Sequence, residues 1–269
     1  MIKFVATDID GTIVNWGHKI TDKVIKCVSK MSVSGIKVVL VTGRMHCATI
    51  PILKKLQLDT PIISYQGGLI KDFSGKTLYK NDLPINYAKE IIDWSRKNNV
   101  HINLYLDDKL YVENDNEIVK YYTDGKFIDY RVKNFDELEI KDVNKILAID
   151  LENPDKVTRW ANFLSIKYPD LSIVKSTPYF CEIGSGTSKK SLGVKFLANL
   201  WNIKKEEILA IGDQNNDIDL ISSAGIGVAM GNASNELKQV AKYITDTVED
   251  DGFVSAMEKF VLNEGKCIK

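Results

Sequence analysis

Two aspartates near the start of the chain are placed to do chemistry together. Asp8 and Asp10 follow the apolar run 2–7, which predicts a strand, and Gly11 comes directly after them. Side chains two positions apart on an extended chain point to the same side, so both carboxylates are expected to face one crevice. Ligands of open α/β sheets bind at the carboxyl ends of strands, where this pair lies. Taken alone, the motif is explained equally well by an acidic turn between a strand and a loop.

A second polar group, Thr42-Gly43-Arg44, follows the β-branched run 36–41, which also predicts a strand. A hydroxyl and the N–H groups of a glycine turn that leads into a helix suit the binding of a phosphate. The alternative is an ordinary turn in which Thr42 caps the helix.

A third group, at 212–217, follows the predicted strand 208–211. It contains Asp213, Asn216 and Asp217, and carboxylate oxygens are the ligands that Mg²⁺ prefers. Asp residues also favour the start of a helix, so an acidic helix cap is the alternative. Lys189 lies before this group, in the first turn of the predicted helix 188–201, where the helix dipole disfavours a cation. Lys190 stands beside it, so a solvated lysine is the alternative there.

The combination is more informative than any one group. Three strand ends carry polar residues in chain order, and a parallel sheet brings such ends to one edge. Carboxylates that lie close together need a counter-charge, which a metal ion supplies.

The elements predict an α/β fold with an insertion. Helices at 21–33 and 45–57 alternate with strands at 36–41 and 61–65, and the alternation resumes after residue 186 with strands at 208–211 and 226–229. The middle of the chain instead shows a hairpin at 101–113, further strands at 145–150 and 171–183, and helices at 85–98 and 153–167. We therefore predict a Rossmann-like parallel-sheet core formed by 1–83 and 186–269, with a smaller α+β cap domain at 84–185.

Composition limits the partners and the compartment. Lys plus Arg and Asp plus Glu both number 36 in 269 residues, so no net positive charge is present to hold nucleic acid or an anionic membrane. The four cysteines are far apart in the sequence and predict reduced thiols. No signal peptide or membrane-spanning run is recognised, so a cytoplasmic protein is expected. A monomer and a homodimer both remain open.

These motifs, in this order, resemble the haloacid dehalogenase superfamily of phosphatases, and within it the Cof-type subgroup with a type IIB cap. The similar segments are 8–12, 42–44, Lys189 and 212–217, together with 228–233 and 249–252. Nearly the whole chain is covered. Two positions depart from the pattern, because Gln66 stands where the family usually has Asn, and Lys190 stands where Gly commonly follows the lysine.

The resemblance implies a Mg²⁺-dependent phosphatase that hydrolyses small phosphorylated metabolites, such as sugar phosphates or phosphorylated cofactors, through an aspartyl phosphate. Asp8 would be the nucleophile and Asp10 the acid and base, with Lys189 as the third catalytic residue. The implied metal ligands are Asp8, the Asp10 carbonyl and Asp213. The implied phosphate-binding residues are Ile9, Gly11, Thr42, Gly43, Lys189 and Asn216, with Thr12 and Asp217 supporting them.

Three alternatives stay open. A phosphomutase of the same superfamily would keep the phosphate and donate it again. A phospho-accepting receiver module also uses an Asp cluster, a Thr and a Lys. Such a module is phosphorylated at the end of a middle strand, however, and it has no inserted domain. A sugar-phosphate binder with a degenerate site is the third.

Overall fold

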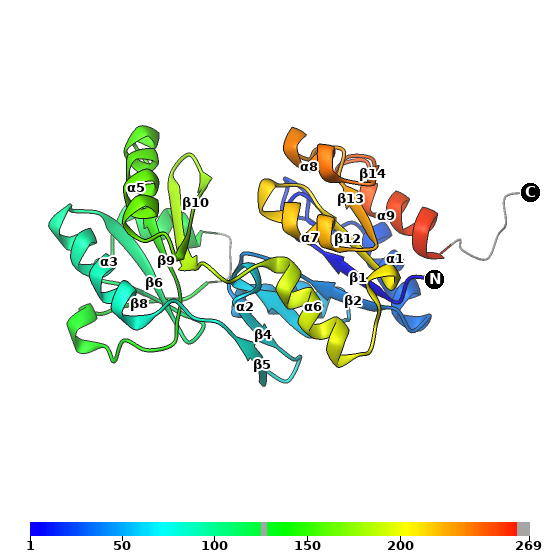
Figure 1. Ribbon diagram of the computed structural model, residues 1–269, viewed down its shortest axis with the longest axis horizontal. Helices are drawn as coiled ribbons and strands as arrows, with labels where there is room; N and C mark the ends of the chain where they lie inside the picture. The colour runs from blue at the N-terminus through cyan, green and yellow to red at the C-terminus, as the bar shows by residue number, and fades with distance from the viewer. Residues whose placement is uncertain (125–127, 263–269) are drawn as a thin grey trace, which may run out of the picture. The chain divides into compact units, whose positions relative to one another are not determined.

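The computed structural model describes residues 1–124 and 128–262. The chain divides into two compact units (Figure 1), one formed by Met1–Tyr79 with Lys189–Lys269 and the other by Lys80–Ser188. The sequence placed the two boundaries after residues 83 and 185, whereas the structure divides the chain after Tyr79 and after Ser188.

The first unit is built on a parallel sheet of five strands in the order β14-β13-β12-β1-β2. These strands are β1 (Phe4–Thr7), β2 (Lys37–Leu40), β12 (Ile208–Gly212), β13 (Ile226–Ala229) and β14 (Tyr243–Ile244). All four residues of β1 are buried, which explains its continuous apolar run, because the strands of a parallel sheet are covered on both faces. Thr7 is level with Leu40 of β2 and with Ile211 of β12, so the three strands end at the same edge.

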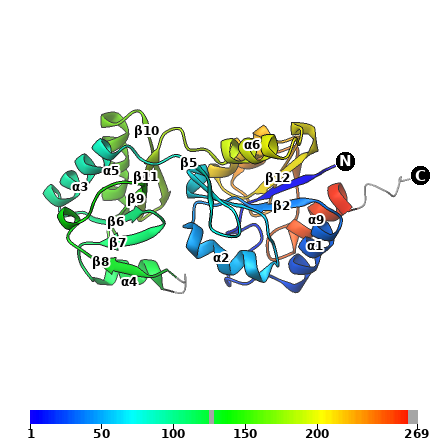
Figure 2. The ribbon, with the colours of Figure 1, turned by 90° about the horizontal axis from the view of Figure 1, so that it is seen from below.

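Helices cover both faces of this sheet, with α6 on one face and α1, α2 and α9 on the other (Figure 2). The helices are α1 (Asp22–Val33), α2 (His46–Lys55), α6 (Lys190–Leu200), α7 (Ile218–Ser223), α8 (Asn235–Val240) and α9 (Gly252–Met257), which continues into the π-helical η5 (Glu258–Leu262). Single 3₁₀ turns are η1 (Tyr65–Gly67), η3 (Lys205–Glu207) and η4 (Asn215–Asp217). This architecture confirms the predicted parallel-sheet α/β core.

One predicted strand of the core pairs differently. The strand expected at 61–65 is β3 (Ile62–Ser64), which lies next to β2 and meets the parallel sheet through an isolated bridge between Val41 and Ile63. It instead begins a separate three-stranded sheet with β4 (Leu69–Lys71) and β5 (Thr77–Lys80), two strands that the sequence analysis did not predict. The physical reason is the tight turn at η1, which reverses the chain and pairs β3 antiparallel with β4.

The second unit contains a six-stranded sheet in the order β10-β11-β9-β6-β7-β8. Its strands are β6 (His101–Leu106), β7 (Lys109–Val112), β8 (Tyr130–Val132), β9 (Val143–Ile149), β10 (Leu171–Thr177) and β11 (Phe180–Ser185). The predicted hairpin is β6–β7, turned by Asp107 and Asp108 in the left-handed region. The helical elements are α3 (Ile85–Lys97), α4 (Glu117–Thr123), α5 (Pro154–Lys167) and the 3₁₀ turn η2 (Phe135–Glu137). Figure 2 shows α3 and α5 on one face and α4 on the other, so this unit is an α+β domain, as predicted.

Three of the cysteines, Cys27, Cys47 and Cys181, are free thiols, and Cys267 lies outside the described residues. Within residues 1–124 and 128–262, every helix is too short or too polar to cross a membrane.

Candidate active site

Three buried carboxylates meet at the edge where β1 and β12 end. Asp8 follows β1, Asp213 follows β12, and Asp217 ends the turn η4. The Asp8 N–H donates to the Ile211 carbonyl at 3.0 Å, which continues the parallel pairing and brings the two strand ends side by side. One carboxylate oxygen from each of the three aspartates lies within 4.8 Å of the others. The predicted meeting of Asp8 and Asp213 is therefore present in the structure, and Asp217 joins them directly.

The lysine in this cluster is Lys190, and the expectation that Lys189 points inward is wrong. The Lys190 Nζ atom donates to Asp8 Oδ1 at 2.5 Å and to Asp217 Oδ1 at 2.6 Å, and its side chain is fully buried. Lys189 is the N-cap of α6 and is exposed. The helix itself explains the correction, because its buried face includes Lys190, Gly193, Val194 and Leu197. This spacing of three and four residues was visible in the sequence and places position 190 on the inner face.

Burial has the largest effect on the pKa values of the cluster. Burial raises the pKa of Asp8 well above its ordinary value, and the charges of Asp217, Asp213 and Asp10 raise it further, although Lys190 opposes them. Burial likewise raises the pKa of Asp213 to about 6. Burial disfavours the charged form of Lys190, but the attraction of Asp217 and Asp8 is greater and raises its pKa. The cluster contains three carboxyl groups and one ammonium group, so it has more acidic groups than its single cation can neutralise.

Asp217 also shapes the loop that carries Asp213. Its Oδ2 atom accepts from the N–H groups of Asp213 at 3.0 Å and Gln214 at 3.2 Å. A Cβ atom at Gly212 would lie 2.5 Å from the Asp217 carboxyl, so only glycine fits there. Asp217 therefore contacts both the lysine and the loop, a larger role than the supporting one that the sequence analysis gave it.

Gly11 and Thr12 hold the loop after β1 against Asp213. A Cβ atom at Gly11 would lie 2.3 Å from Asp213 Oδ2, and its φ of +77° is in the region that favours glycine. The Thr12 hydroxyl donates to Asp213 Oδ1 at 3.3 Å. The Gly11 carbonyl accepts from Asn232 Nδ2 at 2.9 Å, while Asn232 Oδ1 accepts from the Val248 N–H at 2.8 Å. Asn232 thus fixes the loop from a distant segment, and it was not among the predicted site residues, although it lies in the similar segment 228–233.

Asp10 has a different neighbour from the one expected. Its half-exposed carboxylate accepts from Arg44 Nε at 2.8 Å and from Arg44 Nη2 at 2.5 Å, a two-point ion pair. Asp10 was expected to be the acid and base, and Arg44 was given no role. Both oxygens of the Asp10 carboxyl group contact Arg44, so this group must turn away from Arg44 before it can contact a leaving group.

Apart from Lys189, the predicted phosphate-binding residues come from three segments, which are the loop after β1, the loop after β2 and the turn η4. Thr42 is buried, and its hydroxyl oxygen accepts from the Arg44 N–H at 3.1 Å, so a turn is present there. Thr42 does not cap the helix, as the alternative interpretation expected, because the N-cap of α2 is Met45. The side chain of Ile9 is in the core, which leaves only its backbone for binding. Asn216 is exposed and donates to Gln66 Oε1 at 3.3 Å.

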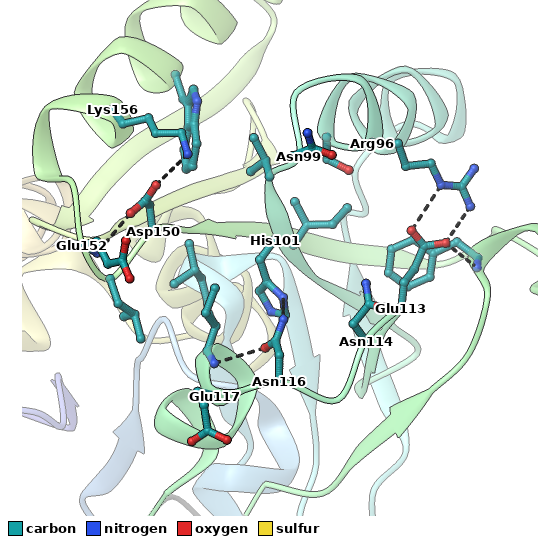
Figure 3. A pocket seen from close by; sticks show the side chains of 18 residues that line it. Arg96, Asn99, His101, Glu113, Asn114, Asn116, Glu117, Asp150, Glu152 and Lys156 are labelled. Carbon is teal, nitrogen blue, oxygen red and sulfur yellow. Dashed lines mark hydrogen bonds and ion pairs between the residues drawn. The ribbon is translucent and has the colours of Figure 1, made fainter.

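The second unit contains a cavity of ≈ 650 Å³ at one end of its sheet (Figure 3). Two ion pairs line it, with Arg96 Nη2 2.6 Å from Glu113 Oε1 and Lys156 Nζ 2.9 Å from Asp150 Oδ2. The His101 ring lies on the floor, where its Nδ1 atom accepts from Asn116 Nδ2 at 3.1 Å. Because these groups are committed to one another, we assign the cavity no role in the reaction.

Comparisons with known proteins agree with this site and fold. A family model described as haloacid dehalogenase-like hydrolase matches residues 5–257. A protein of Streptococcus pyogenes serotype M6 is 33% identical over 272 residues, which cover 97% of this chain and 99% of that protein. The 5-amino-6-(5-phospho-D-ribitylamino)uracil phosphatase YitU of Bacillus subtilis is 25% identical over 269 residues, covering 95% and 96%.

A solved structure of the HAD subclass IIB sugar phosphatase BT4131 superposes with a TM-score of 0.83 at 27% identity, covering 96% of this chain and 98% of that one. The chain belongs to the haloacid dehalogenase-like hydrolase family. This confirms the family and the enzyme class predicted from the motifs, a phosphoric monoester hydrolase.

Proposed function

We propose that this chain is a Mg²⁺-dependent phosphatase that releases phosphate from small metabolites through an aspartyl phosphate on Asp8. The observation that carries the proposal is the buried contact of Lys190 with both Asp8 and Asp217 beside Asp213. Lys190 holds one oxygen of Asp8 and leaves the other for attack on phosphorus.

The acidic cluster fits a divalent cation. Its three carboxylates offer hard oxygen ligands, and their shared ammonium leaves a negative charge that burial makes costly. Asp8, Asp213 and the backbone carbonyl of Asp10 are the residues proposed to hold the metal, with Asp217 supporting them. When bound, Mg²⁺ would offset the repulsion between Asp8 and an anionic phosphate.

The residues of the chain divide the reaction into two displacements. Asp8 attacks phosphorus, the bond from phosphorus to the ester oxygen breaks, and Asp10 gives a proton to the leaving alcohol. Asp10, now a carboxylate, takes a proton from water, which attacks the phosphorus of the aspartyl phosphate and frees Asp8. Thr42, the Gly43 N–H, the loop backbone at Ile9 and Gly11, and Asn216 are proposed to bind the phosphate oxygens.

Sugar phosphates and phosphorylated cofactors or their precursors are the proposed substrates. Support comes from BT4131, a sugar phosphatase, and from YitU, which acts on a phosphorylated ribitylaminouracil. The inserted unit is proposed to set the choice among them. The free thiols Cys27, Cys47 and Cys181 support action in the cytoplasm, a reducing compartment.

Phosphate release from a panel of sugar phosphates, nucleotides and flavin and pyridoxal phosphates, with Mg²⁺ or with EDTA, tests the proposal. Asp8→Asn should abolish release, whereas Asp59→Asn, at an exposed position of the same unit, should not change it. An Asp8→Asn enzyme with full activity would refute the mechanism. Transfer of the phosphate to a second sugar without net release would instead identify a phosphomutase.

A further inference from the structure

Gln66, a residue that departs from the family pattern, lies in a constrained turn that contacts two of the segments proposed to bind phosphate, the loop at 42–44 and Asn216 in η4. Tyr65 and Gln66 both have positive φ angles, 51° and 57°, which non-glycine residues adopt rarely. The Tyr65 N–H donates to the Arg44 carbonyl at 3.2 Å, and the Gln66 N–H donates to the Thr42 carbonyl at 3.0 Å. The turn is therefore hydrogen-bonded to the chain on both sides of Gly43.

The side chain of Gln66 extends from this turn across Gly43. A Cβ atom added to Gly43 would lie 2.5 Å from Gln66 Nε2, so the amide group packs directly on the glycine. At the other end of the amide, Oε1 accepts from Asn216 Nδ2 at 3.3 Å. An Oε1 atom that faces the amino group of Asn216 leaves Nε2, a donor, on the side of Gly43.

We infer that Gln66 is a phosphate-binding residue whose Nε2 donates to the oxygen that the Gly43 N–H also binds. The inference rests on the proposed function and extends its site by one residue. Asn216 fixes the orientation of the Gln66 amide, and Gln66 in turn keeps Asn216 turned toward the site. An Asn at this position has one methylene less and cannot span the same distance from the turn.

The test is the affinity of the Mg²⁺-loaded protein for inorganic phosphate, measured by calorimetry. Gln66→Glu keeps the shape and the acceptor for Asn216 but replaces the donor with an oxygen. Gln57→Glu is the matched control, because it makes the same change at an exposed residue that also has a positive φ of 54°. Gln66→Asn is the second variant, because it keeps the amide and adds no charge.

We expect Gln66→Glu to weaken phosphate binding by about tenfold or more, because it removes one hydrogen bond to a charged group and places a carboxylate beside the anion. Gln57→Glu should change it by less than about twofold, and Gln66→Asn should raise KM for a phosphate ester more than it lowers kcat. Wild-type affinity in folded Gln66→Glu protein, or in Gln66→Asn if the first variant does not fold, would overturn the inference. A wild type that binds phosphate but releases none from any ester would overturn the proposed function alone.

Discussion

Replacing Lys190 with Met should damage both the stability and the activity of the enzyme. The change removes the ammonium that contacts Asp8 at 2.5 Å and Asp217 at 2.6 Å, in a site where the lysine side chain has no exposed surface. Removing one partner of a buried ion pair costs about 3–5 kcal/mol, because the remaining charges are left unpaired. Asp8 and Asp217 would both lose their counter-charge, so we expect a loss of at least about 3 kcal/mol in metal-free protein at pH 7.5.

The loss of stability should shrink when Mg²⁺ is present, because a cation held by the same carboxylates restores part of the missing charge. Activity should fall about a hundredfold or more, since the nucleophile is no longer held in place. Urea unfolding followed by circular dichroism gives the free energy of unfolding, and phosphate release gives kcat.

Lys189→Met is the control for this experiment, one residue away in the same helix. Its side chain is exposed, and a surface substitution of this kind changes stability by about 0.5 kcal/mol or less. Equal losses in the two variants, or a larger loss at Lys189, would refute the assignment of the inward lysine.

Three further predictions concern charge and protonation. Burial raises the pKa of Asp213 to about 6, so its buried charge lowers the stability of the protein above pH 6, and this effect disappears as the pH falls. Asp213→Asn should therefore stabilise the EDTA-treated protein by about 2 kcal/mol at pH 8 and by less at pH 5. The same variant should lose its activity with Mg²⁺. A destabilised Asp213→Asn protein at pH 8 would contradict this. Arg44→Gln should raise kcat about tenfold for alkyl phosphates, because it frees Asp10, but only about twofold for p-nitrophenyl phosphate, because only a poor leaving group needs the proton of Asp10. An equal rise in kcat in an Asp10→Asn background would show that Arg44 does not act through Asp10. Burial lowers the pKa of His101, so as the pH falls the unfolded chain binds a proton at this residue before the folded protein does. Stability should therefore fall as the pH drops below about 6.5. His101→Asn should flatten this pH dependence in urea titrations, whereas the same substitution at the exposed His18 should leave it unchanged.

The sequence predicted the parts of the site that depend on strand ends. Asp8 and Asp213 follow apolar runs, and neighbouring parallel strands must end at one edge, so their meeting followed from topology. Lys190 could have been found in the same way from the spacing of buried positions along α6. Lys189 was predicted because it matches the family pattern, whereas the helix periodicity of this chain favours Lys190.

Other features had no sequence signal of that kind. The ion pair between Asp10 and Arg44 depends on side-chain directions in two loops, which periodicity does not define. The reversal of the chain after β3 depends on two consecutive residues with positive φ, Tyr65 and Gln66, neither of which is a glycine. Propensity alone favours continuing the alternation there, and tertiary contacts override it.

The position of β1 between β2 and β12 has a consequence for synthesis on the ribosome. β2 follows β1 closely in the chain, but β12 begins only at Ile208, after the whole second unit has been made. During translation the edge of β1 that pairs with β12 therefore stays unpaired while the inserted domain is synthesised. Nascent chains arrested before residue 208 should bind chaperones that recognise exposed apolar strands, and chains extended past β13 should release them.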